Sequence, residues 1–286
     1  MPVISLIAPP SKLDVSLVQN LQSAWGAVGD AVWLSPDEAA EFPVDQVPTN
    51  LDTVRGDLAA MRVDINIVPD ENRRKTLLIA DMDSTMIEQE CIDELAVEAG
   101  VGDRVADITA RAMNGELDFE EAIIERVSLL KGLPLSIIEK VIETRISLAS
   151  GGRTLVQTMK ANGAYTALVS GGFVQFTEVI GGRLGFGETR ANRLNSEDGH
   201  LTGDVARPIL GREAKVEALQ ELCPKVENAI AVGDGANDLG MIQLAGMGVA
   251  LHAKPIVAAA APQRVDHGDL TALLYLQGYS RDEFVE

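Results

Sequence analysis

The stretch "KTLLIADMDSTMIEQE", from Lys75 to Glu90, places Asp81 and Asp83 one residue apart, directly after a short apolar run. A short apolar run bounded by polar segments is typical of a strand that is buried in a parallel sheet. In open α/β sheets, ligands bind outside the carboxyl ends of the strands. The stretch therefore predicts a buried strand whose end presents two carboxylates to a ligand.

Further short apolar runs alternate with helical patterns after this stretch, which indicates βαβ units and a doubly wound parallel sheet in an α/β fold. The runs are "AYTALV", "AIAV" and "GVAL". Between the first two strands, residues 87–150 carry apolar side chains at helical spacing, for example Ile123, Ile124, Val127 and Leu130. We expect this segment to form a helical cap, and residues 71–286 to form one domain that includes it.

Residues 1–70 predict a separate small α/β domain, with the pattern strand, helix, strand, helix, strand. The polar segment "PDENRRK", residues 69–75, has the composition of an exposed linker. The βα pattern resembles the small amino-acid-binding regulatory domains of the ACT type, although fewer strands are evident than in their full pattern. A dimerisation or packing domain explains the pattern equally well, so a homodimer is one expectation.

A polar segment near the middle of the chain, "GETRANRLNSEDGHLTGDV", alternates polar and apolar residues around Asp198 and Gly199. Asp-Gly between alternating residues is a strong signal for a two-residue hairpin turn. We expect a β-ribbon that lies beside the sheet.

The composition limits the partners of the chain. Its 286 residues are 46% hydrophobic and carry a formal net charge of -19. That charge disfavours binding to a nucleic-acid backbone or to an anionic membrane surface. No apolar run reaches the roughly 18 residues needed to cross a bilayer, and the first ten residues do not form a signal peptide. The interpretation is a cytoplasmic protein that binds a small molecule.

Two more predicted strands end in residues that can take part in chemistry. Ser170, Gly171 and Gly172 follow the second strand, and "GDGAND", from Gly233 to Asp238, follows the third. Taken singly, each motif is also explained by a helix cap, a loop or a turn. Together, and in this order, they predict one acid-rich site. Such an oxygen-only cluster selects Mg²⁺.

The candidate metal-binding residues are Asp81, Asp83, Asp234 and Asp238. Asp81 and Asp234 are expected as direct ligands, and Asp238 is expected to hold the waters of the metal. Lys215 lies near the start of the pattern "REAKVEALQEL". On its own it reads as a solvated helix residue, but beside this site it could meet a phosphate.

The four motifs and the helical insertion resemble the phosphatases of the haloacid dehalogenase superfamily, from about Thr76 to the C-terminus. Glu90, Arg126 and the segment "ANRLNSEDGHLTGDV" narrow the resemblance to the phosphoserine phosphatase family. The resemblance implies Mg²⁺-dependent hydrolysis of O-phosphoserine to serine and phosphate, the last step of serine biosynthesis. It also implies an aspartyl-phosphate intermediate.

The resemblance assigns roles to individual residues. Asp81 would be the nucleophile, and Asp83 the general acid and base. Glu90 would accept from the ammonium group of the substrate, and Arg126 would pair with its carboxylate. The full set of implied substrate-binding residues is Glu90, Met113, Phe119, Arg126, Ser170, Gly171, Lys215 and Asn237. From its position alone, Arg126 is explained better by a surface ion pair with Glu121 or Glu125 on its own helix.

Two other functions remain open. The first is a phosphatase or phosphotransferase of the same fold that acts on another small phosphomonoester. The second is a non-catalytic amino-acid sensor in which the N-terminal domain binds the ligand. Glu90 and Arg126 favour an amino-acid substrate over the first function. The adjacent Asp81 and Asp83 argue against the second, because a binding domain does not need them.

Overall fold

The computed structural model describes residues 1–113 and 116–286. Two compact units make up the chain, and each combines segments that are distant in sequence. Unit 1 consists of residues 1–79, 150–166 and 219–286, and unit 2 consists of residues 80–149 and 167–218. The boundary expected near residue 70 therefore lies inside unit 1.

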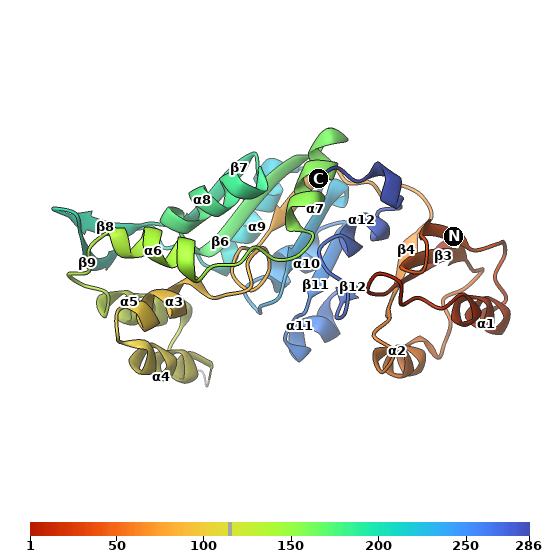
Figure 1. Ribbon diagram of the computed structural model, residues 1–286, viewed down its shortest axis with the longest axis horizontal. Helices are drawn as coiled ribbons and strands as arrows, with labels where there is room; N and C mark the ends of the chain where they lie inside the picture. Colours follow the sequence, from red (N-terminus) through yellow and green to blue (C-terminus); the bar gives the residue numbers. More distant parts are fainter. Residues whose placement is uncertain (114–115) are drawn as a thin grey trace. The chain divides into compact units, whose positions relative to one another are not determined.

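The N-terminal module of unit 1 has the element order β-α-β-β-α-β of the split βαβ motif (Figure 1). Its elements are β1 (Pro2–Ile7), α1 (Val15–Trp25), β2 (Val32–Ser35), β3 (Ala39–Pro43), α2 (Leu51–Ala59) and β4 (Asp64–Pro69). The four strands form one sheet in the order β2-β3-β1-β4, and β1 pairs antiparallel with both β3 and β4. The sequence analysis missed β3, because its five residues include Glu41 and Pro43 and give no clear alternation.

Alternate residues of this sheet face the two helices. Ile4 and Leu6 of β1 pack in one apolar cluster with Phe42 of β3, Val18 of α1 and Leu58 of α2. All five of these side chains are at most 3% exposed. The side chains of the opposite face of β1 are buried as well, which explains why the strand reads as an almost continuous apolar run.

The segment 69–75 is less exposed than a linker of this composition suggests. Arg73 is buried, and its guanidinium donates to both carboxylate oxygens of Glu41 and to the backbone oxygens of Tyr275 and Leu276. The ammonium group of Lys75 donates to two backbone oxygens. These two buried cations thus satisfy backbone acceptors, three of which lie far away in sequence.

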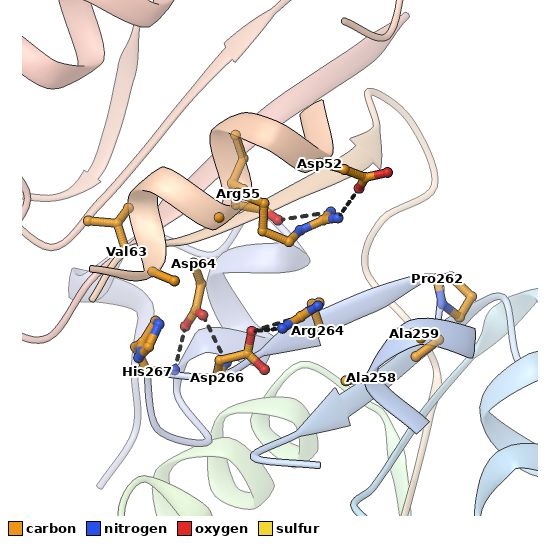
Figure 2. A pocket seen from close by; sticks show the side chains of 14 residues that line it. Asp52, Arg55, Val63, Asp64, Ala258, Ala259, Pro262, Arg264, Asp266 and His267 are labelled. Atoms are coloured by element: carbon orange, nitrogen blue, oxygen red, sulfur yellow. Dashed lines mark hydrogen bonds and ion pairs between the residues drawn. The ribbon is translucent and has the colours of Figure 1, made fainter. Parts of the chain in front are cut away.

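The beginning of β4 is joined to the C-terminal part of unit 1 by Asp64. Its carboxylate accepts the backbone N–H groups of Asp266, His267 and Gly268 at 2.8, 3.1 and 2.8 Å (Figure 2). A cavity of about 430 Å³ lies beside this contact. Its two guanidinium groups are already paired, Arg55 with Asp52 and Arg264 with Asp266. None of the residues proposed for the active site lines this cavity.

A six-stranded sheet has the order β12-β11-β10-β5-β6-β7. Its strands are β5 (Leu77–Ala80), β6 (Tyr165–Phe173), β7 (Glu188–Asn192), β10 (Ala229–Gly233), β11 (Met247–Leu251) and β12 (Gln263–Val265). The helices between these strands are α7 (Gly152–Ala161), α8 (Val174–Leu184), α9 (Arg212–Leu222), the 3₁₀ helix η1 (Val226–Asn228), α10 (Leu239–Leu244) and α11 (Pro255–Ala260). After β12 the chain forms α12 (Ala272–Leu276) and the 3₁₀ helix η2 (Arg281–Glu283). The strand order reverses between the central strands β5 and β10. The carboxyl ends of these two strands are therefore a topological switch point, the usual ligand-binding position in such a sheet. The predicted doubly wound α/β fold is confirmed.

The predicted helical insertion between β5 and β6 is also confirmed. It contains α3 (Cys91–Glu98), α4 (Gly102–Met113), α5 (Phe119–Ser128) and α6 (Ser136–Thr144). A capping box starts α5, because Asp118 and Glu121 each accept the backbone N–H of the other. Among the described helices, none has the length and apolar character of a membrane span.

The expected ribbon consists of β8 (Leu194–Glu197) and β9 (His200–Val205), which form a separate antiparallel pair. Asp198 and Gly199 at the turn both have positive φ, 49° and 75°, as a two-residue hairpin turn requires. The location differs from the expectation, because β9 packs against the cap helix α5 (Figure 1). The earlier part of the same stretch forms β7 and joins the main sheet.

Candidate active site

Asp81 directly follows β5 and is buried. One oxygen, Oδ1, accepts the N–H of Met82 at 2.8 Å, and Oδ2 lies 2.8 Å from Nζ of Lys215. The Lys215 side chain is only 2% exposed. A buried ion pair loses much of its Coulombic attraction to desolvation, so it is weak evidence for a role in stability. We therefore interpret this pair as part of the site.

The chain turns sharply after Asp81. The carbonyl oxygen of Met82 accepts the N–H groups of Thr85, Met86 and Ile87. This turn brings Asp83 back toward the segment after β6. There its Oδ1 accepts the N–H of Cys91 at 2.9 Å, and its Oδ2 accepts the hydroxyl of Ser170 at 3.3 Å.

The environment of Asp83 raises its pKa to about 7. Burial contributes most, and the negative charges of Glu90 and Asp81 add to it. The hydrogen bond from Cys91 acts in the opposite direction. At neutral pH a substantial fraction of Asp83 therefore carries a proton.

Ser170, Gly171 and Gly172 lie in a bulge of β6. The pairing of β6 with β7 shifts between Val169 and Phe173, so these three residues have no regular partners in the ladder. The N–H of Gly172 donates to the Ser170 hydroxyl at 2.9 Å. A Cβ atom on Gly172 would lie 2.6 Å from Oδ2 of Asp83, so only glycine allows the carboxylate to approach.

Asn192, the last residue of β7, supports this bulge and was missed by the sequence analysis. Its side-chain amide donates to the backbone oxygens of Gly171 and Leu210 at 2.9 and 3.1 Å and accepts the N–H of Leu210 at 2.7 Å. The side chain is buried. It joins the bulge to the segment that precedes α9, the helix that carries Lys215.

Replacing Asn192 by alanine should lower kcat about tenfold or more for every substrate, since a small displacement of catalytic groups is costly. The change leaves two partly buried carbonyl groups and one N–H without this partner. Gln175 provides a matched control, because its amide contacts the backbone of Leu194 in a similar way but outside the site. Steady-state kinetics of both alanine variants test this. Equal losses of kcat would mean that Asn192 has no special role in the site.

Arg126 lies on α5 and is partly buried. Its Nε donates to the backbone oxygen of Ala122 at 3.2 Å, and no ion pair of Arg126 is found among the described residues. Burial lowers the pKa of the guanidinium, while Asp93, Glu90 and Asp83 act to raise it. Arg126 therefore faces a negative environment, and no described residue forms an ion pair with it.

The alternative ion pairs for Arg126 on its own helix do not occur. Glu125 pairs with Arg111 at 2.9 Å, and Glu121 belongs to the capping box.

Glu90 precedes α3, is exposed and accepts the Ser84 hydroxyl at 2.8 Å.

Phe119 and Met113 were the two residues expected to line the substrate pocket. Phe119 is 40% exposed, and its ring lies close to Gly171, where an added Cβ would be 3.2 Å from Cζ of the ring. Met113 ends α4, but its side chain is outside the part of the chain that the structure describes. The charge of Arg126 acts to lower the pKa of Asp93, so these two residues interact. Asp93 was not predicted as a site residue, because an aspartate on a helix does not by itself indicate a function.

The "GDGAND" loop of unit 1 follows β10. The N–H of Gly235 donates to Oδ2 of Asp238 at 3.0 Å, and the N–H of Asp238 donates to the oxygen of Gly235 at 2.9 Å. These bonds turn the loop back on itself. Asp234 and Asp238 are buried, and Asn237 is partly buried.

Three buried carboxylates have the chemistry of metal ligands: Asp81 in unit 2, and Asp234 and Asp238 in unit 1. Buried oxygen ligands without nitrogen or sulfur suit a hard divalent cation. The carboxylate of Asp83, the fourth candidate ligand, contacts Cys91 and Ser170.

Comparison with known proteins identifies the family. The family model for haloacid dehalogenase-like hydrolases matches residues 78–243. The chain belongs to the haloacid dehalogenase-like hydrolases. A phosphoserine phosphatase from Streptococcus thermophilus is 46% identical over 200 residues, which cover 68% of this chain and 93% of that protein.

Two further relatives of this hydrolase extend over more of the chain. A phosphoserine phosphatase from Streptomyces coelicolor is 41% identical over 256 residues, or 87% of this chain. The chain spans 62% of the length of that relative. The crystal structure of a haloacid dehalogenase family hydrolase from Salmonella enterica serovar Typhi matches with a TM-score of 0.87 and 30% identity, and the match covers 99% of both chains.

Proposed function

We propose that this hydrolase is a phosphoserine phosphatase, which hydrolyses O-phosphoserine to serine and inorganic phosphate. The observation that carries the proposal is the position of Arg126. Its partly buried guanidinium has no ion pair among the described residues and lies in the electrostatic field of Asp93, Glu90 and Asp83. A substrate carboxylate would supply the missing partner. Relatives named as phosphoserine phosphatases support the choice.

The first chemical step forms a phosphoenzyme. A carboxylate oxygen of Asp81 attacks phosphorus in line with the seryl oxygen, and the bond between phosphorus and that oxygen breaks. Asp83, with its raised pKa, donates its proton to the departing oxygen and becomes a carboxylate. Serine is released, and Asp81 carries the phosphoryl group as an aspartyl phosphate.

The second step reverses the role of Asp83. Its carboxylate takes a proton from a water molecule whose oxygen attacks phosphorus, and the bond to Asp81 breaks. Inorganic phosphate leaves, and both aspartates return to their initial states. The Lys215 ammonium, the Ser170 hydroxyl and the N–H of Gly171 would stabilise the charge on the phosphoryl oxygens in both steps.

The buried oxygen donors fit Mg²⁺, and we propose it as the cofactor. Asp81 and Asp234 would hold the ion directly, and Asp238 would hold its water ligands. Bound there, Mg²⁺ supplies positive charge that neutralises the phosphate and keeps its own ligands ionised.

Asp238→Asn should raise the Mg²⁺ concentration needed for half-maximal activity roughly 10- to 100-fold, the usual cost of losing a residue that supports metal ligands. The amide keeps the size of the side chain but removes its negative charge. A titration of activity with MgCl₂ measures the shift. An unchanged half-maximal concentration would show that Asp238 does not support the metal.

Substrate recognition is assigned to the cap. Arg126 would donate two parallel hydrogen bonds to the substrate carboxylate, and Glu90 would accept from its ammonium group. Phe119 lies against Gly171 and would exclude water from the reacting phosphate. The small N-terminal domain has the element order of ACT-type domains, and we propose a regulatory or dimer-forming role for it.

The test of this function is phosphate release with Mg²⁺ over a panel of O-phosphoserine, O-phosphothreonine and glucose 6-phosphate. We expect O-phosphoserine to have the highest kcat/KM. A higher value for the sugar phosphate would assign the protein to a different substrate within the same family. No phosphate release from any substrate would favour a non-catalytic sensor.

A further inference from the structure

The cap helix α5 is connected at its C-terminal end to the hairpin of β8 and β9. Gly132 donates its N–H to the oxygen of Leu201 at 2.8 Å, and Leu201 donates to the oxygen of Leu133 at 2.8 Å. Leu135 donates to the oxygen of Gly199 at 2.9 Å. The segment after α5 is thus bonded to β9 and to the hairpin turn.

Gly203 of β9 lies close to the end of α5. A Cβ atom on Gly203 would lie 2.9 Å from Cβ of Lys131 and 3.4 Å from the backbone oxygen of Ser128, the last residue of α5. Real Cβ atoms almost never approach other atoms as closely as 2.9 Å. Gly203 is buried and has a φ of +85°. Only glycine therefore allows β9 to pack this closely against the end of α5.

The N-terminal end of α5 contacts the same stretch of chain. Arg207 forms an ion pair with Glu120, the second residue of α5. Gly203 of β9 therefore lies close to the last residue of α5 and Arg207 pairs with its second residue, and Arg126 lies on the helix between these contacts. The two segments are more than seventy residues apart in the sequence, and the sequence alone did not connect them.

We propose that β9 and Arg207 position α5 for substrate recognition, with Gly203 as the positioning residue that sets the location of Arg126. This inference rests on the proposed function, because it assumes that Arg126 binds the substrate carboxylate. A helix moves as a rigid element, so a displacement at Ser128 is transmitted to Arg126 two residues earlier. A guanidinium that donates two parallel hydrogen bonds tolerates little displacement.

The test compares Gly203→Ala with Gly199→Ala. Both glycines have positive φ, +85° and +75°, so alanine introduces backbone strain at each position. Only Gly203 has close neighbours, because nothing lies within 4 Å of a Cβ on Gly199. Any difference between the variants thus reports the contact with the end of α5.

We expect Gly203→Ala to lower kcat/KM for O-phosphoserine about tenfold or more, mainly through KM, since a misplacement of 1 Å can cost about a hundredfold. Hydrolysis of phosphoethanolamine, which has no carboxylate, should stay within about twofold of the wild type. Gly199→Ala should leave the ratio of the two efficiencies unchanged. Adding Lys131→Gly to Gly203→Ala removes the clashing Cβ and should restore part of the ratio.

Arg207→Ala is the second variant, for the case in which Gly203→Ala does not fold. Arg207 is exposed, so its replacement should not prevent folding. We expect it to lower the efficiency ratio in the same direction but by less, about two- to threefold, because exposed ion pairs are weak. An unchanged ratio in every folded variant would overturn the proposal. A wild-type enzyme without preference for O-phosphoserine over phosphoethanolamine would instead refute the proposed function.

Discussion

Asp81→Asn is expected to lower phosphate release at least about 10,000-fold, because removing a catalytic nucleophile costs up to about a millionfold in other enzymes. The asparagine amide keeps the oxygen that accepts the N–H of Met82. It is a poor nucleophile and a poor metal ligand. It also loses the charge that pairs with the buried Lys215.

Trapping the phosphoenzyme separates this role from a general disturbance of the site. Wild-type protein quenched with acid during turnover of ³²P-labelled O-phosphoserine should retain label on Asp81. The asparagine variant should retain none, although circular dichroism should show that it is folded. Phosphate release near the wild-type rate, or label on the variant, would mean that another residue is the nucleophile.

The acidic part of the site could be predicted from the sequence because each motif is local. Asp81 and Asp83 directly follow an apolar strand, and Asp234 and Asp238 follow another. In a parallel sheet, the position directly after a strand determines where a side chain lies. The family resemblance then supplied the roles of the individual residues.

The missed strands show what the sequence could not indicate. β7 and β12 are the two edges of the six-stranded sheet. Their sequences, "ETRAN" and "QRV", are polar and short, because an edge strand is covered less completely than an inner one. Apolar periodicity therefore identifies the inner strands and not the edges.

The missed functional residues depend on partners that are distant in sequence. Asn192 contacts Gly171 and Leu210, and Gly203 contacts Lys131. An asparagine or glycine in a polar stretch normally indicates a turn. Only the tertiary contacts show that these two residues support the bulge of β6 and the cap helix.

The substrate choice depends most on Arg126. If its guanidinium binds the substrate carboxylate, Arg126→Ala leaves a desolvated carboxylate without a partner, which costs about 2 to 5 kcal/mol. The expected loss in kcat/KM for O-phosphoserine is roughly 30- to several-thousand-fold, at about 1.4 kcal/mol for each factor of ten. Arg126→Lys keeps the charge but not the paired geometry, so its loss should be smaller.

Arg111→Ala is the matched control, because it removes the same charge from the cap at a position that pairs with Glu125. It should change kcat/KM less than about threefold, as expected for an exposed ion pair. Phosphoethanolamine is the matched substrate, since it presents an ammonium and a phosphate but no carboxylate. Its slower hydrolysis should change little in Arg126→Ala, whereas Asp81→Asn should remove activity on both substrates. Equal losses on both substrates in Arg126→Ala would make Arg126 a structural residue, and the proposed function would then reduce to a phosphatase of unspecified substrate.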